Sequence, residues 1–229
     1  MSIGYRDGAS GDNSNAPATA VIPADVQPGD VLLAFGGVYL NGGTPSSLSL
    51  VSAGPTAPSL IRSDPVTGIN LRTGIFWWVA AAGDPGATLT FQSGGGLNYG
   101  GFSVVAYHGA DTSSQPDVAS YGDSGGSSVP SFTAPGATTA TAGDWALYCA
   151  GQSGGSGISG NPGTLRQADA SYNYAVIADS NGSVGGSGTV IGGGAWTDGS
   201  SGMFWGYTIG LKPAASLASP SGLLLAGIV

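Results

Sequence analysis

The stretch QPGDVLLAF, residues 27–35, predicts the fold of this chain. Its first four residues have the chemistry of a turn, because proline fixes φ and glycine allows a positive φ. The five residues that follow are apolar on both faces of an extended chain. A strand with two apolar faces belongs in the middle of a sheet that is covered on both sides. We therefore expect residues 31–40 to form a central, buried strand.

The pattern returns at residues 141–149, where the sequence reads TAGDWALYC. Other segments of the first half have similar counterparts in the second half, in the same order. The pairs are Ile61-Arg62 with Leu165-Arg166, residues 74–80 with 174–178, residues 88–90 with 189–191, and residues 102–108 with 203–211. The spacing between copies changes only across loops, where insertions are tolerated. The sequence thus predicts two duplicated sets of strands.

The composition favours strands over helices. The chain has no glutamate and a single lysine, so two residues that favour surface helices are nearly absent, and no segment shows sustained helical periodicity. About ten short strands separated by glycine and proline turns indicate an all-β sandwich. We expect residues 1–213 to be one β-sandwich domain with halves of about 1–110 and 128–213. Residues 214–229 differ in composition and are expected to be an extended, apolar C-terminal arm.

Charge and targeting signals exclude several classes of partner. The net charge is −8 and only five basic residues are present, so the chain should not bind nucleic acid or an anionic membrane surface. No apolar run approaches the ~20 residues of a membrane span, and we expect no membrane insertion. The N-terminus lacks the basic and apolar regions of a signal peptide, which predicts synthesis in a cytoplasm without export. The single cysteine, Cys149, cannot form an intrachain disulfide and should be a buried thiol.

Two short motifs resemble functional signatures, but their contexts argue against function. GDSGG at residues 122–126 has the letters that surround a serine-protease nucleophile, yet His108, the only histidine, lies just sixteen residues before Ser124. GSGISG at residues 155–160 matches a dinucleotide-binding pattern, but a turn rather than a helix follows it. We therefore predict no catalytic residue, no cofactor and no enzymatic activity.

The aspartates are interpreted as structural residues. A zinc site would need clustered histidine and cysteine, which this chain does not have. Asp111, Asp117 and Asp123 could supply oxygen ligands for calcium, as could Asp7 and Asp12, but their spacing follows no known calcium loop. We predict no metal site. Asp30 and Asp144 each follow a glycine and are expected to accept backbone N–H groups within turns.

The remaining candidates are aromatic residues in loops and the apolar C-terminal arm. Tyrosine among Ser, Gly and Asn is typical of adaptable binding loops, and aromatic faces stack on sugars. The candidates for contact with a glycan or another partner are Tyr99, Tyr121, Tyr172 and Trp196. The alternative is that these aromatics pack inward and rigidify the loops. The candidate assembly contacts are Leu223, Leu224, Leu225, Ile228 and Val229, which either fold back as an extra strand or dock on a neighbouring subunit.

Three segments resemble a known family. VIPADVQPGDVLLA (21–34), FWWVAAAGDPG (76–86) and IGLKP (209–213) are similar to patterns in minor tail and other virion structural (decoration-type) proteins of tailed phages that infect actinobacteria. The resemblance covers about residues 20–213 and implies a jelly-roll-like β-sandwich with no catalytic residues to carry over. It leads us to expect a virion protein, a capsid decoration or minor tail component, whose partners are other virion proteins and copies of itself. The alternative is a carbohydrate-binding adhesin module for host attachment through a surface glycan.

Overall fold

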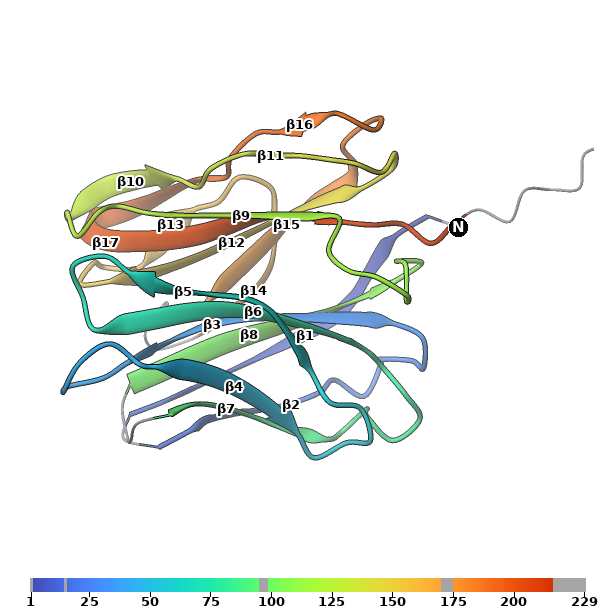
Figure 1. The fold of residues 1–229 in the computed structure, drawn as a ribbon, viewed down its shortest axis with the longest axis horizontal. Coiled ribbons are helices and arrows are strands. Elements are labelled where there is room, and N and C mark those ends of the chain that lie inside the picture. Colours follow the sequence, from blue (N-terminus) through green and yellow to red (C-terminus); the bar gives the residue numbers. More distant parts are fainter. Residues whose placement is uncertain (1, 15, 95–98, 170–174, 216–229) are drawn as a thin grey trace, which may run out of the picture.

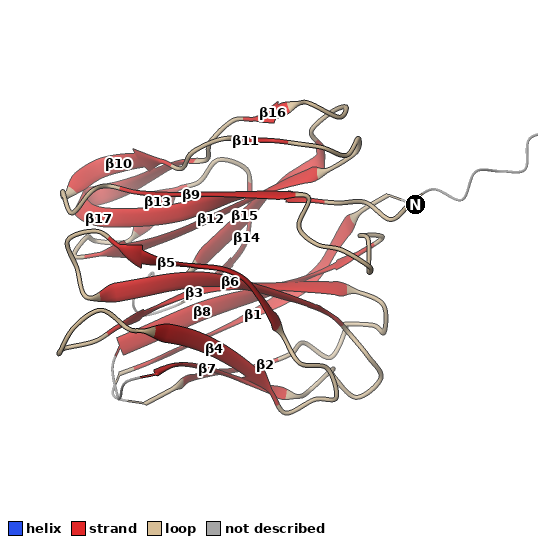
Figure 2. Cartoon of the chain, in the orientation of Figure 1, coloured by secondary structure: helices blue, strands red, loops and turns tan. Residues whose placement is uncertain are grey.

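The computed structural model describes residues 2–14, 16–94, 99–169 and 175–215. Within these residues all regular structure is β, as Figure 2 shows, so the prediction of an all-β sandwich is confirmed. The strands of the described residues are β1 (Gly4–Asn13), β2 (Ala18–Val21), β3 (Val31–Tyr39), β4 (Ser47–Ser52), β5 (Ser59–Val66), β6 (Leu71–Val79), β7 (Thr88–Gly94), β8 (Tyr99–His108), β9 (Val118–Asp123), β10 (Val129–Thr133), β11 (Ala137–Thr138), β12 (Trp145–Ser153), β13 (Ile158–Gly160), β14 (Thr164–Ala168), β15 (Val176–Ser183), β16 (Val190–Ile191) and β17 (Ala195–Leu211).

The same strand order occurs twice. The first half forms an antiparallel sheet in the order β1-β8-β3-β6-β5, and the second half forms one in the order β9-β17-β12-β15-β14. In addition, β2 pairs with β7 in the first half and β11 pairs with β16 in the second. The start of β17 also pairs with β10 and β13. The duplication that the sequence suggested is therefore visible in the strand connections.

The sheets are stacked in layers (Figure 1). The small sheet β2-β7-β4 covers one face of the first five-stranded sheet, and the large sheet of the second half covers the other face. The central strand β3 is apolar on both faces because it lies between them. Leu32 and Ala34 pack toward the small sheet, whereas Leu33 and Phe35 pack toward the second half.

A continuous apolar layer joins the two halves. Leu33 and Phe35 of β3 meet Leu147 and Cys149 of β12 there, and all four are at most 2% exposed. The ring of Phe35 lies 5.7 Å from the ring of Tyr207, edge to face. Cys149 is a free, buried thiol, as expected, and burial raises its pKa. Burial of this layer is the main force that holds the halves together.

A polar group, the Arg166 cluster, lies at one side of this layer. Arg166 and Asp179 belong to the second half, and the Nε of Arg166 lies 2.7 Å from a carboxylate oxygen of Asp179. The two tyrosines of the cluster come from the first half. The hydroxyl of Tyr107 donates to the same carboxylate at 2.8 Å, and the guanidinium of Arg166 lies 4.6 Å from the ring centre of Tyr5. Burial and the nearby Asp179 raise the pKa of Tyr107 well above its usual value, so the hydroxyl keeps its proton.

A second polar group, the Arg62 cluster, has the same composition with the halves exchanged. Arg62 and Asp64 come from the first half, and Arg62 Nε lies 2.6 Å from Asp64. Tyr207 of the second half donates its hydroxyl to Asp64 at 2.9 Å, and Arg62 lies 5.6 Å from the ring centre of Tyr121. Each half thus supplies the ion pair for one cluster and the two tyrosines for the other. The two clusters give the contact between the halves a pseudo-symmetric polar border.

The two clusters differ in burial, and this predicts different costs of breaking them. The side chains of Arg166 and Asp179 are 13% and 0% exposed, whereas those of Arg62 and Asp64 are 41% and 16% exposed. Arg166→Met should lower the free energy of unfolding by about 3 kcal/mol, because it leaves a buried carboxylate without its counter-charge. Arg62→Met should lower the free energy of unfolding by only about 1 kcal/mol, because water screens the exposed Arg62–Asp64 pair. Urea denaturation of both variants measures the difference; equal losses would contradict this ranking.

Candidate functional site

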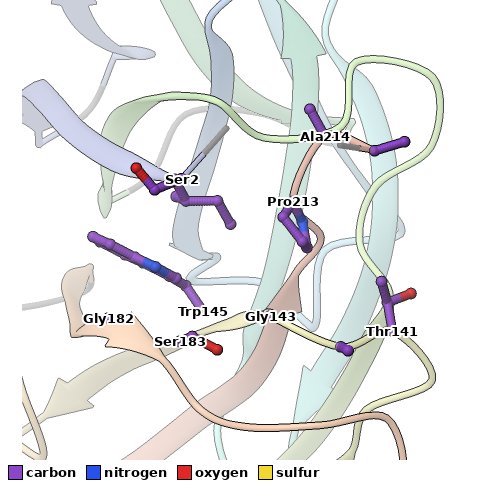
Figure 3. A pocket seen from close by; sticks show the side chains of 11 residues that line it. Ser2, Thr141, Gly143, Trp145, Gly182, Ser183, Pro213 and Ala214 are labelled. Atoms are coloured by element: carbon purple, nitrogen blue, oxygen red, sulfur yellow. The ribbon is translucent and has the colours of Figure 1, made fainter. Parts of the chain in front are cut away.

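An open pocket of about 510 Å³ lies where the two ends of the described chain meet (Figure 3). Ile3 from the N-terminal segment, Trp145 from the start of β12, and Pro213 after β17 contribute to its wall, together with residues 141–143. Ala215, the last described residue, also lines it. We call this the terminal pocket. The chain that follows residue 215 therefore begins at its rim.

Backbone hydrogen bonds hold the walls of the terminal pocket in place. The N–H of Asp111 donates to the carbonyl of Lys212 at 2.8 Å, and the N–H of Ala214 donates to the carbonyl of Gly109 at 2.9 Å. These bonds fix the path of the chain after β17. On the opposite wall, Gly143 has a φ of 87°, which only glycine adopts readily, and its N–H donates to Gly185.

The chemistry of the terminal pocket suits an apolar segment better than a reaction. Its described lining consists of small, apolar and hydroxyl-bearing residues, and none of these carries an acidic, basic or thiol side chain. Trp145 is the large side chain in the wall, 9% exposed. General acid–base or nucleophilic catalysis needs a titratable or activated group within hydrogen-bond reach of a substrate. The pocket is accordingly a candidate docking site.

The serine of the GDSGG motif lies in a structural turn. Ser124 donates its hydroxyl to the carbonyl of Ser127 at 2.7 Å and accepts the N–H of Phe204 at 3.2 Å. Ser124 lies beside Phe204 in β17, whereas Ala110, two residues after His108, pairs with Pro213 beyond the end of the same strand. The chain from residue 204 to residue 213 spans roughly 30 Å at about 3.3 Å per strand residue. Ser124 and His108 are therefore not brought together.

The aromatic residues singled out from the sequence do not form one surface. Trp196 is 0% exposed and packs in a core cluster with Phe204, so it offers no ring face to a sugar and the prediction of a glycan contact does not hold there. Tyr121 is half-buried within the Arg62 cluster. Tyr99 is half-buried and lies 6.3 Å, ring to ring, from Tyr39. For Trp196 and Tyr121 the alternative of inward packing describes the structure better.

Other sequence-based candidates fall outside the described residues or contribute to turns. Tyr172 and the arm residues Leu223, Leu224, Leu225, Ile228 and Val229 lie outside the described residues. Within the described ranges, no three His, Cys, Asp or Glu side chains gather in a way that could hold a metal ion. The same part of the chain has no helix of the length and apolarity needed to cross a membrane. The carboxylate of Asp111 instead accepts hydrogen bonds from Ser113 and Ser114.

The turn prediction for the two glycine-linked aspartates is right for one and wrong for the other. Asp30 accepts the N–H of Gln27 at 2.8 Å, as expected. Asp144 is 0% exposed, and neither of its carboxylate oxygens has a hydrogen-bond donor among the described residues. Sequence reasoning missed this difference.

The environment of Ser124 predicts that this serine is unreactive. Its hydroxyl is engaged with backbone groups on both sides, and no histidine base is near it. Treatment with a fluorophosphonate probe should therefore leave Ser124 unlabelled in intact-mass and peptide spectra, with a serine protease labelled in parallel as the positive control. An adduct on this chain that disappears in Ser124→Ala would contradict the assignment.

None of the comparisons with known proteins assigns a role to these residues. Comparison with protein-family models, with curated proteins and with solved structures finds no match. A function must therefore be argued from the geometry of the chain itself. The terminal pocket, whose lining includes Ala215, is the described feature best suited to a partner.

Proposed function

We propose that this chain is a structural protein of a tailed-phage virion, a capsid decoration or minor tail component, and that it acts by subunit assembly. The observation that carries the proposal is the terminal pocket, because Ala215 lines it and the apolar residues 223–229 follow soon after in the sequence. The family resemblance of residues 20–213 supports the same function. The chain is made in the host cytoplasm and becomes part of the particle.

The arm has the length and chemistry to occupy a terminal pocket. Residues 216–222 separate Ala215 in the pocket lining from Leu223, and seven residues treated as a random coil have a typical span of about 15 Å. The arm can therefore reach the terminal pocket of an adjacent copy when the faces that carry the two pockets oppose each other. Its apolar residues Leu223, Leu224 and Leu225 would lose contact with water there, at about 25 cal/mol per Å² of apolar surface. Exchange of arms between copies gives a repeated, self-complementary contact.

The rest of the surface is compatible with assembly. Charged residues make up only 8% of the chain, so few long side chains have to be immobilised in a contact. The layered sheets with their polar border form a rigid body that can present the pocket and the arm in a fixed direction. The proposed partners are other virion proteins and further copies of this chain.

Removing the arm tests the proposal. A chain truncated after Ala215 should fold with unchanged circular dichroism but lose self-association, measured by analytical ultracentrifugation of both forms. Gly182 lines the pocket and has room for a side chain, so the bulky Gly182→Leu should weaken association in the full chain. Gly192→Leu is the matched control, because Gly192 also has open space but does not line the pocket. A full-length chain that is a stable monomer, unchanged by the truncation, would argue strongly against assembly through the arm.

A second candidate function is carbohydrate binding for host attachment, and one observation favours it. Tyr99 and Tyr39 lie directly opposite each other in neighbouring strands β8 and β3, and both rings are half-buried. Paired aromatic rings at the end of a sheet can stack on a sugar. Under this hypothesis Tyr99→Ala abolishes binding on an array of host-wall glycans, whereas Tyr148→Ala, at another half-exposed tyrosine, leaves it intact. Absence of binding by the unmodified chain would remove this candidate.

A further inference from the structure

The first half neutralises its buried aspartate with an arginine. Asp30 directly precedes β3 and is 3% exposed. Arg6 in β1 places Nε 2.5 Å and Nη2 3.1 Å from the two carboxylate oxygens of Asp30. The N–H of Gln27 adds a third hydrogen bond at 2.8 Å. The negative charge of Asp30 is therefore fully compensated where it is removed from water.

The second half places an acid where the first half has that arginine. Asp144 directly precedes β12, the counterpart of β3, and is 0% exposed. The counterpart of β1 is β9. Asp7 lies opposite Ala106 in β8, and Val118 lies opposite Gly210 in β17, at the matching position. The residue before Val118 is Asp117, so it occupies the place of Arg6.

Asp117 and Asp144 meet beside Gly210. A Cβ atom on Gly210 would lie 3.0 Å from a carboxylate oxygen of Asp144 and 3.6 Å from the Cβ of Asp117. The N–H of Asp117 donates to the carbonyl of Gly210 at 2.9 Å, which fixes its backbone there. Asp144 is buried and Asp117 is half-buried, and two neighbouring carboxylates of this kind repel each other when both are ionised.

The groups around the pair leave Asp144 without a close positive partner. Lys212, after β17, is the cation that faces it, but its Nζ donates to Ser114 and lies 3.9 Å from Asp111. On the side of β15, residues 180–183 carry no charge. The carboxylate of Asp117 already accepts the N–H groups of Ala140 and Thr141, at 2.5 and 2.9 Å. With no close cation or N–H donor, Asp144 can lose its buried negative charge only by binding a proton.

We propose that Asp144 holds a proton that it shares with Asp117, and that losing this proton loosens the turn of residues 139–144, which forms one wall of the terminal pocket. Asp144 donates this proton to the carboxylate of Asp117, which in turn binds the backbone of the turn. Ionisation of Asp144 breaks the contact and sets two negative charges against each other. The device is independent of the proposed function, since it rests only on the buried pair.

Burial raises the pKa of Asp144 to about 7, and the neighbouring Asp117 acts in the same direction through the proposed hydrogen bond and through charge repulsion. The pKa of Asp117 is lowered despite its burial, because the proposed hydrogen bond from Asp144 and the N–H groups of Ala140 and Thr141 stabilise its carboxylate. In the unfolded chain Asp144 has an ordinary pKa near 3.8. The folded state therefore binds more protons between these values. The stabilisation from the proton on Asp144 is therefore complete below about pH 4 and is lost as the pH rises to about 7.

The variant Asp144→Asn tests the proposal, because its amide still donates to Asp117 and has no charge to lose. Urea denaturation should give equal unfolding constants for the variant and the natural chain at pH 4. At pH 8 the variant should be more stable by a factor on the order of 100- to 1,000-fold. The matched control is Asp30→Asn, which breaks the ion pair with Arg6 and should destabilise the chain at both pH values. A constant ratio between Asp144→Asn and the natural chain across this range would overturn the proposal.

Two measurements on the unmodified chain keep the test independent of how the variant folds. Carboxyl ¹³C NMR should show one aspartate that titrates near pH 7, and hydrogen exchange of residues 139–144, corrected for intrinsic rates, should accelerate above that pH. All aspartates titrating near pH 4 would refute the shared proton. Adding Ca²⁺ or Mg²⁺ at pH 8 should leave stability unchanged. Stabilisation by either ion in the natural chain but not in Asp144→Asn would instead identify a cation site and replace the proton.

Discussion

The packing of β3 against β12 through one apolar layer is the contact on which the rest of the structure depends. Both strands lie at the centre of a sheet, so their inward side chains have no access to water unless the halves separate. Aromatic residues fill much of this layer, and the hydroxyls of Tyr107 and Tyr207 reach its border. Buried hydroxyls require partners, and the Arg166 and Arg62 clusters provide them across the contact. The polar border is thus a consequence of the aromatic packing.

The duplicated halves share strand order but differ in their charges. An antiparallel sheet is specified by hydrophobic pattern and register, which tolerate change at the ends of strands. The end of a strand is where Arg6 compensates Asp30 in one half and Asp117 faces Asp144 in the other. The terminal pocket and the exit toward the arm lie at this same end of the second half. This difference in charge between the halves therefore lies beside the terminal pocket.

The candidate site was much harder to predict from the sequence than the fold. Trp196 and Tyr121 lie near glycine and serine in the sequence, which suggested exposed binding loops. Trp196 is instead buried in a cluster with Phe204 of its own strand and with residues of β12 and β15. Tyr121 packs on Tyr207 at the contact between the halves. Local composition does not show which face of a strand another layer will cover. The terminal pocket also combines segments more than 200 residues apart in the chain, Ile3 and Pro213, which no local pattern connects.

The sequence by itself determined the all-β class, the central strand after residues 27–30 and its counterpart after residues 141–144. It could do so because turn chemistry and the apolar character of a strand are local properties. It also paired Arg62 with Arg166 as equivalent positions. Only the tertiary structure decided that each half supplies the ion pair of one polar cluster and the tyrosines of the other. It also decided that Asp117 stands in the place of Arg6. Burial and charge compensation depend on what packs from distant parts of the chain, and that information exists only once the layers have assembled.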